Sequence, residues 1–338
     1  MTLPNLSSPD IMLQMISGFW VSRIVYAAAK LGIADLFEDR PRTVAELATL
    51  TNTHPQSLYR LLRALASVGI FEEKEKHLFA ITPLAQTLQS DVPGSLRYMA
   101  IAELDYAHTL AWSNLIPSLE TGEVGFDRAA GMSCWDYYAQ HPEDGETFNR
   151  YMTNLTAMVQ TAVLASYDFS GFDTIVELGG GQGSLLASIL SKNPHLNGIL
   201  YELPFVIAEA QQNLQATGLS DRIQTISGDF FESAPSGGDA YLMKSVIHDW
   251  NEEKCVTILR NCHRAMPDRG KLLLIESVVE EGNNPSFTKL VDLVMLVGTG
   301  GQERTAVEYQ TLLELSGFKL TRVIPTPSPF HIIEAEKC

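Results

Sequence analysis

A glycine-rich turn near the middle of the chain has the composition of a nucleotide-binding loop. Residues 175–184 read IVELGGGQGS, which predicts a buried strand, a tight turn and the start of a helix. Glycine allows such a turn and lets a ligand lie directly on the backbone. The dinucleotide pattern G-x-G-x-x-G fails, because its last position is Ser184 counted from Gly179 and Leu186 counted from Gly181. A nucleotide without a pyrophosphate therefore fits better than NAD.

Two acidic residues follow the next two predicted strands. Glu202 lies at the end of the run GILYEL, 19 residues after Gly183, where a Rossmann-like fold places a carboxylate that accepts both ribose hydroxyls. Asp229 and Phe230 follow the run IQTIS and supply a carboxylate and a ring on which adenine can stack. Each motif is weak alone, because a glycine turn after a strand often serves another nucleotide or only packing. Together they favour an adenosine-bearing ligand.

His248 stands between the predicted strand AYLMKS and a predicted helix over residues 252–265. An isolated histidine at that place would most simply cap the helix. Asp249 and Asn251 are better caps, which leaves His248 as a candidate base. An imidazole with a pKa of about 6.5 can take the proton of a phenol with a pKa of about 10 as that oxygen attacks, a contribution of about 10²- to 10⁴-fold.

These residues lie in a region where short β-branched runs alternate with helical segments. The alternation begins after Tyr167 and predicts βαβ units with a parallel sheet. The last two runs, KLTRVI and HIIEA, are separated only by the Pro-rich turn PTPSPF. Two strands separated by so few residues must form a hairpin, so the sheet should contain an antiparallel strand near its end.

The N-terminal part of the chain is mainly helical. Apolar residues recur at helical spacing from residue 11 to residue 37 and predict a long buried helix. Between residues 43 and 88, two helices and a hairpin give a winged-helix pattern, so a DNA-binding transcription regulator is an alternative. The charge balance of this region argues against DNA binding, since its basic residues equal its acidic ones. The basic residues are Arg60, Arg63, Lys74 and Lys76, and the acidic ones are Glu46, Glu72, Glu73 and Glu75.

The composition narrows the function classes. A chain of 338 residues is long enough for two domains, and its formal net charge of -16 disfavours nucleic acid and anionic lipid as partners. The N-terminus has no signal-peptide pattern, and no window holds the roughly 18 uncharged apolar residues of a membrane span, so we expect a cytoplasmic protein. The four cysteines are scattered, which indicates neither disulfides nor a metal site.

Several segments, in order and spacing, resemble the plant caffeic acid-type and bacterial small-molecule O-methyltransferases. They are the glycine turn, YELPFVI, SGDFF, MKSVIHDWNEEKCVTILRNCHRAMPDRGKLLLIES and GTGGQERTAVEYQTLLELSGF. The resemblance covers nearly the whole chain. It implies an α/β fold with a Rossmann-like class I methyltransferase domain over residues 166–338, whose mostly parallel sheet has an antiparallel terminal strand. It also implies a mainly α winged-helix dimerisation and acceptor-lid domain over residues 1–165.

The resemblance also implies roles for individual residues. Gly179 and Gly181 would approach the methionine part of S-adenosylmethionine, Glu202 would hold its ribose, Asp229 and Phe230 its adenine, and Lys244 would contact the cofactor. His248 would be the catalytic base, flanked by Glu276 and Glu303, with Asp249, Met152 and Met295 at the acceptor. Without the resemblance, both glutamates would be interpreted as solvated charges. Glu202 stands where the family more often has Asp.

The predicted function is methyl transfer from S-adenosylmethionine to a hydroxyl, in the first place a phenolic one, of a small aromatic molecule of secondary metabolism, with S-adenosylhomocysteine as product. The alternative within the same fold is N-methylation, hydroxylation or decarboxylation. Residues 99–112 do not align with the family, so the acceptor stays open. We expect a homodimer, because a helix carrying Phe19, Trp20 and Tyr26 is too apolar for a free surface.

Overall fold

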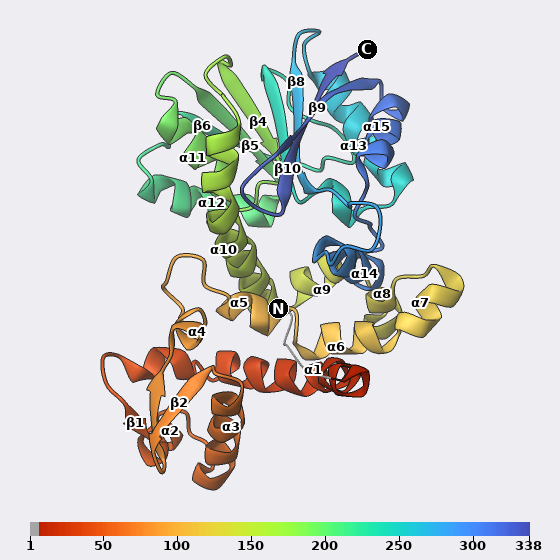
Figure 1. Ribbon diagram of the computed structural model, residues 1–338. Helices are drawn as coiled ribbons and strands as arrows, with labels where there is room; N and C mark the ends of the chain where they lie inside the picture. The colour runs from red at the N-terminus through yellow and green to blue at the C-terminus, as the bar shows by residue number, and fades with distance from the viewer. Residues whose placement is uncertain (1–6) are drawn as a thin grey trace. The chain divides into compact units, whose positions relative to one another are not determined.

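The computed structural model describes residues 7–338, which form two compact units (Figure 1). One unit holds the described residues up to Thr109 together with Glu143–Asn154, and the other holds Leu110–Pro142 and Leu155–Cys338. The division at 165/166 stays a prediction about domains. By contacts, residues 110–142 and 155–165 group with the large sheet, because the chain leaves the first unit, returns to it and leaves again.

The first unit contains the expected winged-helix order. Helices α2 (Val44–Leu50) and α3 (Pro55–Ser67) are followed by strands β2 (Phe71–Glu75) and β3 (Leu78–Ile81), and β1 (Arg42–Thr43) completes an antiparallel sheet of order β1-β3-β2. Thr43 caps α2, because its side chain accepts from the Glu46 N–H while Glu46 accepts from the Thr43 N–H. The remaining elements are η1 (Ile33–Phe37), α4 (Pro83–Gln86) and α5 (Arg97–Ala102).

The first helix, α1 (Ser8–Lys30), differs from the prediction. It was expected to be buried, but only Ala28 and Ala29 near its end are buried. The apolar side chains of its first half are exposed, and Phe19 and Trp20 are 59% and 66% exposed. By length and composition alone this helix could also cross a membrane. The search of the sequence for a run of uncharged apolar residues did not indicate this. An apolar helix this exposed in a single chain needs a partner surface.

The second unit begins with short helices and ends in a seven-stranded sheet. The helices are α7 (Leu115–Thr121), α8 (Gly125–Ala130) and α9 (Cys134–Gln140), with α6 (Tyr106–Ser113) and α10 (Pro142–Ser166) shared between the units. The strands are β4 (Thr174–Leu178), β5 (Asn197–Glu202), β6 (Ile223–Ser227), β7 (Ala240–Lys244), β8 (Lys271–Ser277), β9 (Phe318–Pro325) and β10 (Phe330–Lys337).

The sheet has the order β6-β5-β4-β7-β8-β10-β9. The first five strands are parallel, and β10 pairs antiparallel with both β8 and β9, which confirms the predicted mostly parallel sheet with a terminal hairpin. The strand order reverses direction between β4 and β7. Ligands of open α/β sheets bind at the carboxyl ends of the strands at such a point. The glycine turn follows β4 and His248 follows β7, so both lie where this rule places a ligand.

Helices cover both faces of the sheet (Figure 1). Helices α11 (Ser184–Lys192) and α12 (Pro204–Ala216) cover one face, and α13 (Glu252–Ala265) and α15 (Ala306–Leu315) cover the other. Successive strand residues point to opposite faces, so Ile175 joins the core under α11 while Val176 joins the core under α13. Two apolar cores thus fix the carboxyl edge of the sheet.

Candidate active site

The glycine turn adopts a backbone that side chains rarely tolerate. Gly179 and Gly181 have φ values of 66° and 56°, in the left-handed region. A Cβ on Gly179 would lie 2.8 Å from a methyl group of Val246, so this turn and the one after β7 touch. A Cβ on Gly181 would meet nothing within 4 Å, which leaves open space over its backbone. The turn is therefore close-packed on one side and accessible on the other.

Glu202 at the end of β5 is joined directly to this turn. Its Oε1 accepts from the Gly181 N–H at 3.0 Å, and its Oε2 accepts from the Leu203 N–H at 2.8 Å. Burial raises the pKa of Glu202, while these two backbone donors oppose the rise. Each carboxylate oxygen keeps a second lone pair, so the group can still accept from ribose hydroxyls.

Asp229 and Phe230 follow β6, as predicted. Asp229 Oδ1 accepts from the Phe231 N–H at 2.8 Å, which fixes the tight turn that presents both residues. The ring of Phe230 lies edge-to-face against Phe231 and Trp250, with centroid distances of 5.0 and 6.2 Å. An atom of the Phe230 ring would also lie 3.5 Å from a Cβ on Gly179. The aromatic ring thus borders the glycine turn.

Lys244 ends β7 and is buried, with its Nζ donating to Ser245 Oγ at 3.3 Å. Burial lowers its pKa, while Glu276 and Glu177 oppose the fall. Glu177, the last residue but one of β4, is also buried, and burial raises its pKa to about 8 against the effect of Lys244. Sequence reasoning missed Glu177. The available signal was an acidic residue inside the apolar run IVEL directly before the glycines.

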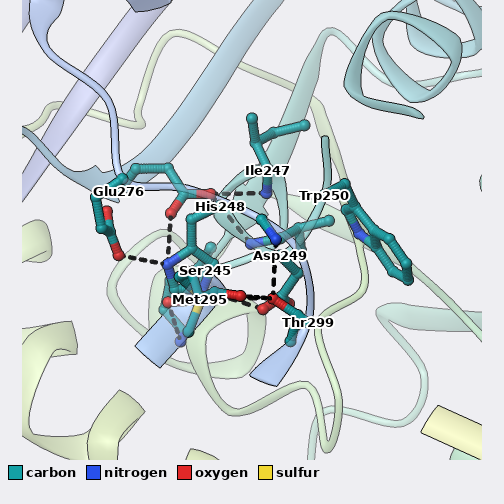
Figure 2. A network of polar contacts seen from close by, with 12 residues as sticks. Ser245, Ile247, His248, Asp249, Trp250, Glu276, Met295 and Thr299 are labelled. Atoms are coloured by element: carbon teal, nitrogen blue, oxygen red, sulfur yellow. Dashed lines mark hydrogen bonds and ion pairs between the residues drawn. The ribbon is translucent and has the colours of Figure 1, made fainter. Parts of the chain in front are cut away.

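The short 3₁₀ turn η2 (Ile247–Asp249) carries His248. Ser245 precedes it with φ 54°, a strained backbone for a non-glycine residue. Glu276, at the end of β8, stabilises the turn because its Oε1 accepts from the N–H groups of Val246 and Ile247 at 3.0 and 2.9 Å. Figure 2 shows the Glu276 side chain beside the Ile247 backbone, with His248 and Asp249 at the centre of the network. Asn251, not His248, caps α13, as the sequence indicated.

His248 lies among three carboxylates. Its Nδ1 is 2.7 Å from Glu303 Oε1 and 3.8 Å from Glu276 Oε2, and its Nε2 is 3.6 Å from Asp249 Oδ1. Burial acts to lower the pKa of His248, but the negative charges of Glu276, Asp249 and Glu303 outweigh it and raise the pKa to about 10. Burial also raises the pKa of Asp249 to about 7, against the effect of His248. The sequence-predicted acid and base residues therefore meet in one buried cluster.

The two predicted acceptor methionines fall in different units. Met295 lies on α14 (Thr288–Gly298), where the Thr299 hydroxyl donates to its carbonyl at 3.2 Å. Helix α14 packs on α8, and Trp135 of α9 packs on Trp250, the residue after η2, with a centroid distance of 5.8 Å. Met152 lies on the first half of α10, which groups with the other unit.

Comparison with known proteins identifies this arrangement. The family model described as an O-methyltransferase domain matches residues 112–319, and that of the O-methyltransferase dimerisation domain matches residues 13–91. The chain belongs to the O-methyltransferase family. This O-methyltransferase accordingly uses S-adenosylmethionine, the cofactor of the family, and transfers its methyl group to a hydroxyl. The dimerisation model covers the winged-helix region, which favours dimerisation over DNA binding there.

The relatives of this O-methyltransferase are biosynthetic enzymes. Phenazine O-methyltransferase PhzM of Lysobacter antibioticus is 46% identical over 326 residues, which cover 96% of this chain and 95% of the relative. The crystal structure of LaPhzM has a TM-score of 0.96 at 44% identity and covers 98% of this chain and all of its own. The O-methyltransferase NcsB1, solved with S-adenosylmethionine and 2-hydroxy-5-methyl naphthoic acid, has a TM-score of 0.86 at 29% identity, with 99% and 100% of the two chains covered.

Proposed function

We propose that this O-methyltransferase methylates a phenolic hydroxyl of a small aromatic molecule, with His248 as the general base. The observation that carries the proposal is the 2.7 Å contact between His248 Nδ1 and Glu303 Oε1. A carboxylate at Nδ1 holds the ring so that Nε2 takes the proton of the acceptor, and it stabilises the imidazolium that forms. When bound, S-adenosylmethionine supplies a methyl group already activated on a positively charged sulfur.

The residues around the glycine turn fit that cofactor. Gly181 offers open backbone, Glu202 stands beside it as an acceptor for ribose hydroxyls, and Asp229 with Phe230 borders the same turn. Lys244 and Glu177 are buried ionisable side chains at neighbouring strand ends, and an ammonium and a carboxyl group are suited to the methionine carboxylate and amine, respectively. Carboxylates outnumber cations in this region, which favours a ligand that brings positive charge.

The protonation state of His248 sets a condition on the proposal. With a pKa near 10, the imidazole is protonated at neutral pH, and an imidazolium cannot act as a base. A positive charge within about 4–6 Å lowers the pKa of an imidazolium. We therefore propose that His248 becomes a base only beside a cationic ligand, which confines proton removal to the loaded site.

We further propose an aromatic acceptor beside Asp249 and Met295. NcsB1 was solved with a hydroxylated naphthoic acid, and PhzM is named for a phenazine, so both relatives point to fused aromatic acceptors. Trp135 and Trp250 pack together next to η2, and tryptophan rings are side chains on which such acceptors can stack.

A product screen tests the acceptor proposal. The protein would be incubated with methyl-labelled S-adenosylmethionine and a panel containing a hydroxyphenazine, 2-hydroxy-5-methyl naphthoic acid and an aminophenazine. We expect a mass gain of one methyl group on a hydroxyl compound, with the attachment atom identified by NMR of the labelled methyl. Methylation of the amine alone would support the N-methylation alternative.

The base assignment is tested by His248→Ala, with His195→Ala as the matched control, since the one hydrogen bond of the His195 ring to the described residues is with the Ser170 backbone carbonyl. We expect His248→Ala to bind S-adenosylhomocysteine normally and to lose at least about 10²-fold in methyl transfer, while the control stays active. Parental turnover in His248→Ala would refute the assignment.

We also propose a cytoplasmic homodimer formed through α1. The support is the dimerisation-domain match over residues 13–91 and the row of exposed apolar side chains on that helix. They are Ile11, Met12, Leu13, Met15, Ile16, Phe19 and Trp20. We expect sedimentation to show a dimer at micromolar concentration, and the double variant Phe19→Glu, Trp20→Glu to be monomeric. A parental chain that sediments as a monomer would refute the proposal.

A further inference from the structure

The loop before Glu303 lies directly on the backbone of the histidine turn. A Cβ added to Gly301 would lie 1.8 Å from the His248 carbonyl oxygen and 2.5 Å from the Asp249 carbonyl carbon. The next residue, Gln302, donates its N–H to the same His248 carbonyl at 2.9 Å. No side chain fits at Gly301 unless one of the two backbones moves. The φ angle of Gly301 is not in the left-handed region, so other residues could adopt its backbone conformation. Glycine is needed here because there is no space for a side chain.

Arg304 reaches the same turn from inside the protein. Its side chain is only 2% exposed, and its guanidinium donates to backbone carbonyls on both sides of His248. Nη1 donates to the Ile247 carbonyl at 3.1 Å, and Nη2 donates to the Trp250 carbonyl at 3.0 Å. Nη1 also donates to the Gln302 carbonyl, at 3.2 Å, in its own loop. Nη2 also donates to Cys255 Sγ, at 3.5 Å, but three of the four hydrogen bonds that the guanidinium forms with the described residues go to backbone carbonyls.

The turn is therefore held at both ends by charged side chains of opposite sign. Glu276 accepts from the N–H groups at its start, and Arg304 donates to the carbonyls at its start and end. Glu303, the sequence neighbour of Arg304, contacts the His248 ring. One short loop thus fixes both the backbone and the ring of the same histidine.

We propose that Arg304 and Gly301 are positioning residues, which set the distance between His248 and Glu303 without touching the ligands. The inference rests on the proposed role of His248. A guanidinium suits this task, because its planar fork bonds two carbonyls at a fixed spacing, whereas an ammonium is a single point. An error of about 1 Å in the position of a catalytic group can cost about 10²-fold in rate.

The simpler interpretation is that Arg304 only stabilises the core. Two substitutions separate these interpretations. Arg304→Lys keeps the buried charge but cannot span both carbonyls, and Arg304→Met keeps the length without charge or donors. Arg260→Met is the matched control, since Arg260 also donates to a backbone carbonyl, that of Leu315, but is exposed and lies away from the turn.

The measurement that does not depend on turnover is the Nδ1 proton resonance of His248, recorded on histidine-labelled protein and assigned by its loss in His248→Ala. We expect Arg304→Lys to remain folded and to bind S-adenosylhomocysteine within about 3-fold, with this resonance shifted or broadened. With the acceptor found in the screen, kcat should fall at least about 10-fold with little change in KM, as expected when a transition-state interaction is lost. Arg260→Met should change neither quantity.

Gly301→Ala supplies a test that leaves every charge in place. Its methyl group must displace either the loop or the turn, so the His248 resonance should change as it does in Arg304→Lys, even if Arg304→Met does not fold. An unchanged resonance and kcat in folded Arg304→Lys and Gly301→Ala would overturn the proposal. If His248→Ala retained activity, the base assignment would fail instead, and the resonance would still report whether the loop positions the ring.

Discussion

Glu303 contacts the Nδ1 of His248 at 2.7 Å although the two residues are 55 positions apart in the chain. Glu276, the other carboxylate near the ring, uses one oxygen for backbone N–H groups and keeps the other 3.8 Å from Nδ1. The two glutamates therefore have different structural tasks: Glu303 orients the ring, and Glu276 holds the turn that carries it.

The first prediction concerns Glu303→Gln. Glu303 is one of the carboxylates that raise the pKa of His248, so its replacement by an amide should lower that pKa. The rising limb of kcat/KM against pH, which follows the neutral imidazole, should move to lower pH, and the plateau should fall at least about 10-fold. Glu308→Gln is the control, because Glu308 only caps α15. A limb that stays in place would contradict the prediction.

The second prediction concerns proton release on cofactor binding. Because the pKa of His248 is raised to about 10, the ring carries a proton below that pH, and a bound sulfonium should expel it. S-adenosylmethionine should therefore release more protons than S-adenosylhomocysteine, whose sulfur is neutral. Calorimetric titrations in two buffers of different ionisation enthalpy measure this difference. About pH 8 is suitable, because it lies below the pKa of His248 and the ring is still protonated there.

The control for this measurement is His248→Ala, in which the difference between the two ligands should disappear. Both ligands carry the same amino and carboxylate groups, so proton exchange at Glu177 cancels in the comparison. Equal proton release for the two ligands in the parental protein would contradict the prediction.

The third prediction concerns Glu202, which contacts the glycine turn through Gly181. Glu202→Gln should weaken S-adenosylhomocysteine binding by about 10- to 100-fold, because charge-assisted hydrogen bonds to a ligand contribute about 1.5–3 kcal/mol. Glu202→Asp keeps the carboxylate and introduces the residue that the family more often has at this position. This variant should bind S-adenosylhomocysteine within a few-fold of the parent. Titration calorimetry measures both. Equal losses in the two variants would contradict the prediction, because Gln keeps the length without the charge and Asp keeps the charge with a shorter side chain.

The fourth prediction concerns acid stability. Burial acts to raise the pKa of Glu334 in β10, but hydrogen bonds from Arg322, Tyr167 and Thr321 outweigh it and lower the pKa to about 2. A carboxylate with a lowered folded-state pKa stabilises the fold above its unfolded pKa, and this contribution is lost as the pH falls from about 4.5 toward 2. Glu334→Gln should therefore lower Tm at neutral pH and flatten the dependence of Tm on pH in the acid range.

The control for that prediction is Glu336→Gln, two residues further along β10. Glu336 is an exposed residue that pairs with Lys271 at the surface. Exposed ion pairs contribute little to stability, so its loss should leave the acid dependence of Tm almost unchanged. Thermal unfolding of both variants from neutral pH to pH 3 compares them, and identical curves would exclude the buried network as the cause.

Much of the fold could be predicted because its signals are local. The glycine turn, the alternation after Tyr167 and the hairpin PTPSPF are each contained in a few neighbouring residues. The site residues from Gly179 to His248 lie at strand ends, which a parallel sheet gathers at one edge. The order of these elements and the position of these site residues could therefore be predicted from the sequence.

The remainder depends on contacts between distant parts of the chain. Whether Glu276 or Glu303 orients His248 could not be predicted, because the answer depends on how the loop of Gly301 lies on the turn. Arg304 gave no signal, since a lone arginine in a loop is normally exposed. The exposure of α1 was misjudged because helical periodicity does not say what covers an apolar face.

Helix α10 limits how this chain can be cut. It runs unbroken from Pro142 to Ser166, yet its residues after Asn154 group with the large sheet, where Val159 and Val163 are part of the core. A fragment starting at residue 166 would lose both valines and expose the sheet face beneath them. An independently expressed catalytic fragment would have to include residues 110–142 and the second half of α10, so the two compact units cannot be produced by a single cleavage of the backbone.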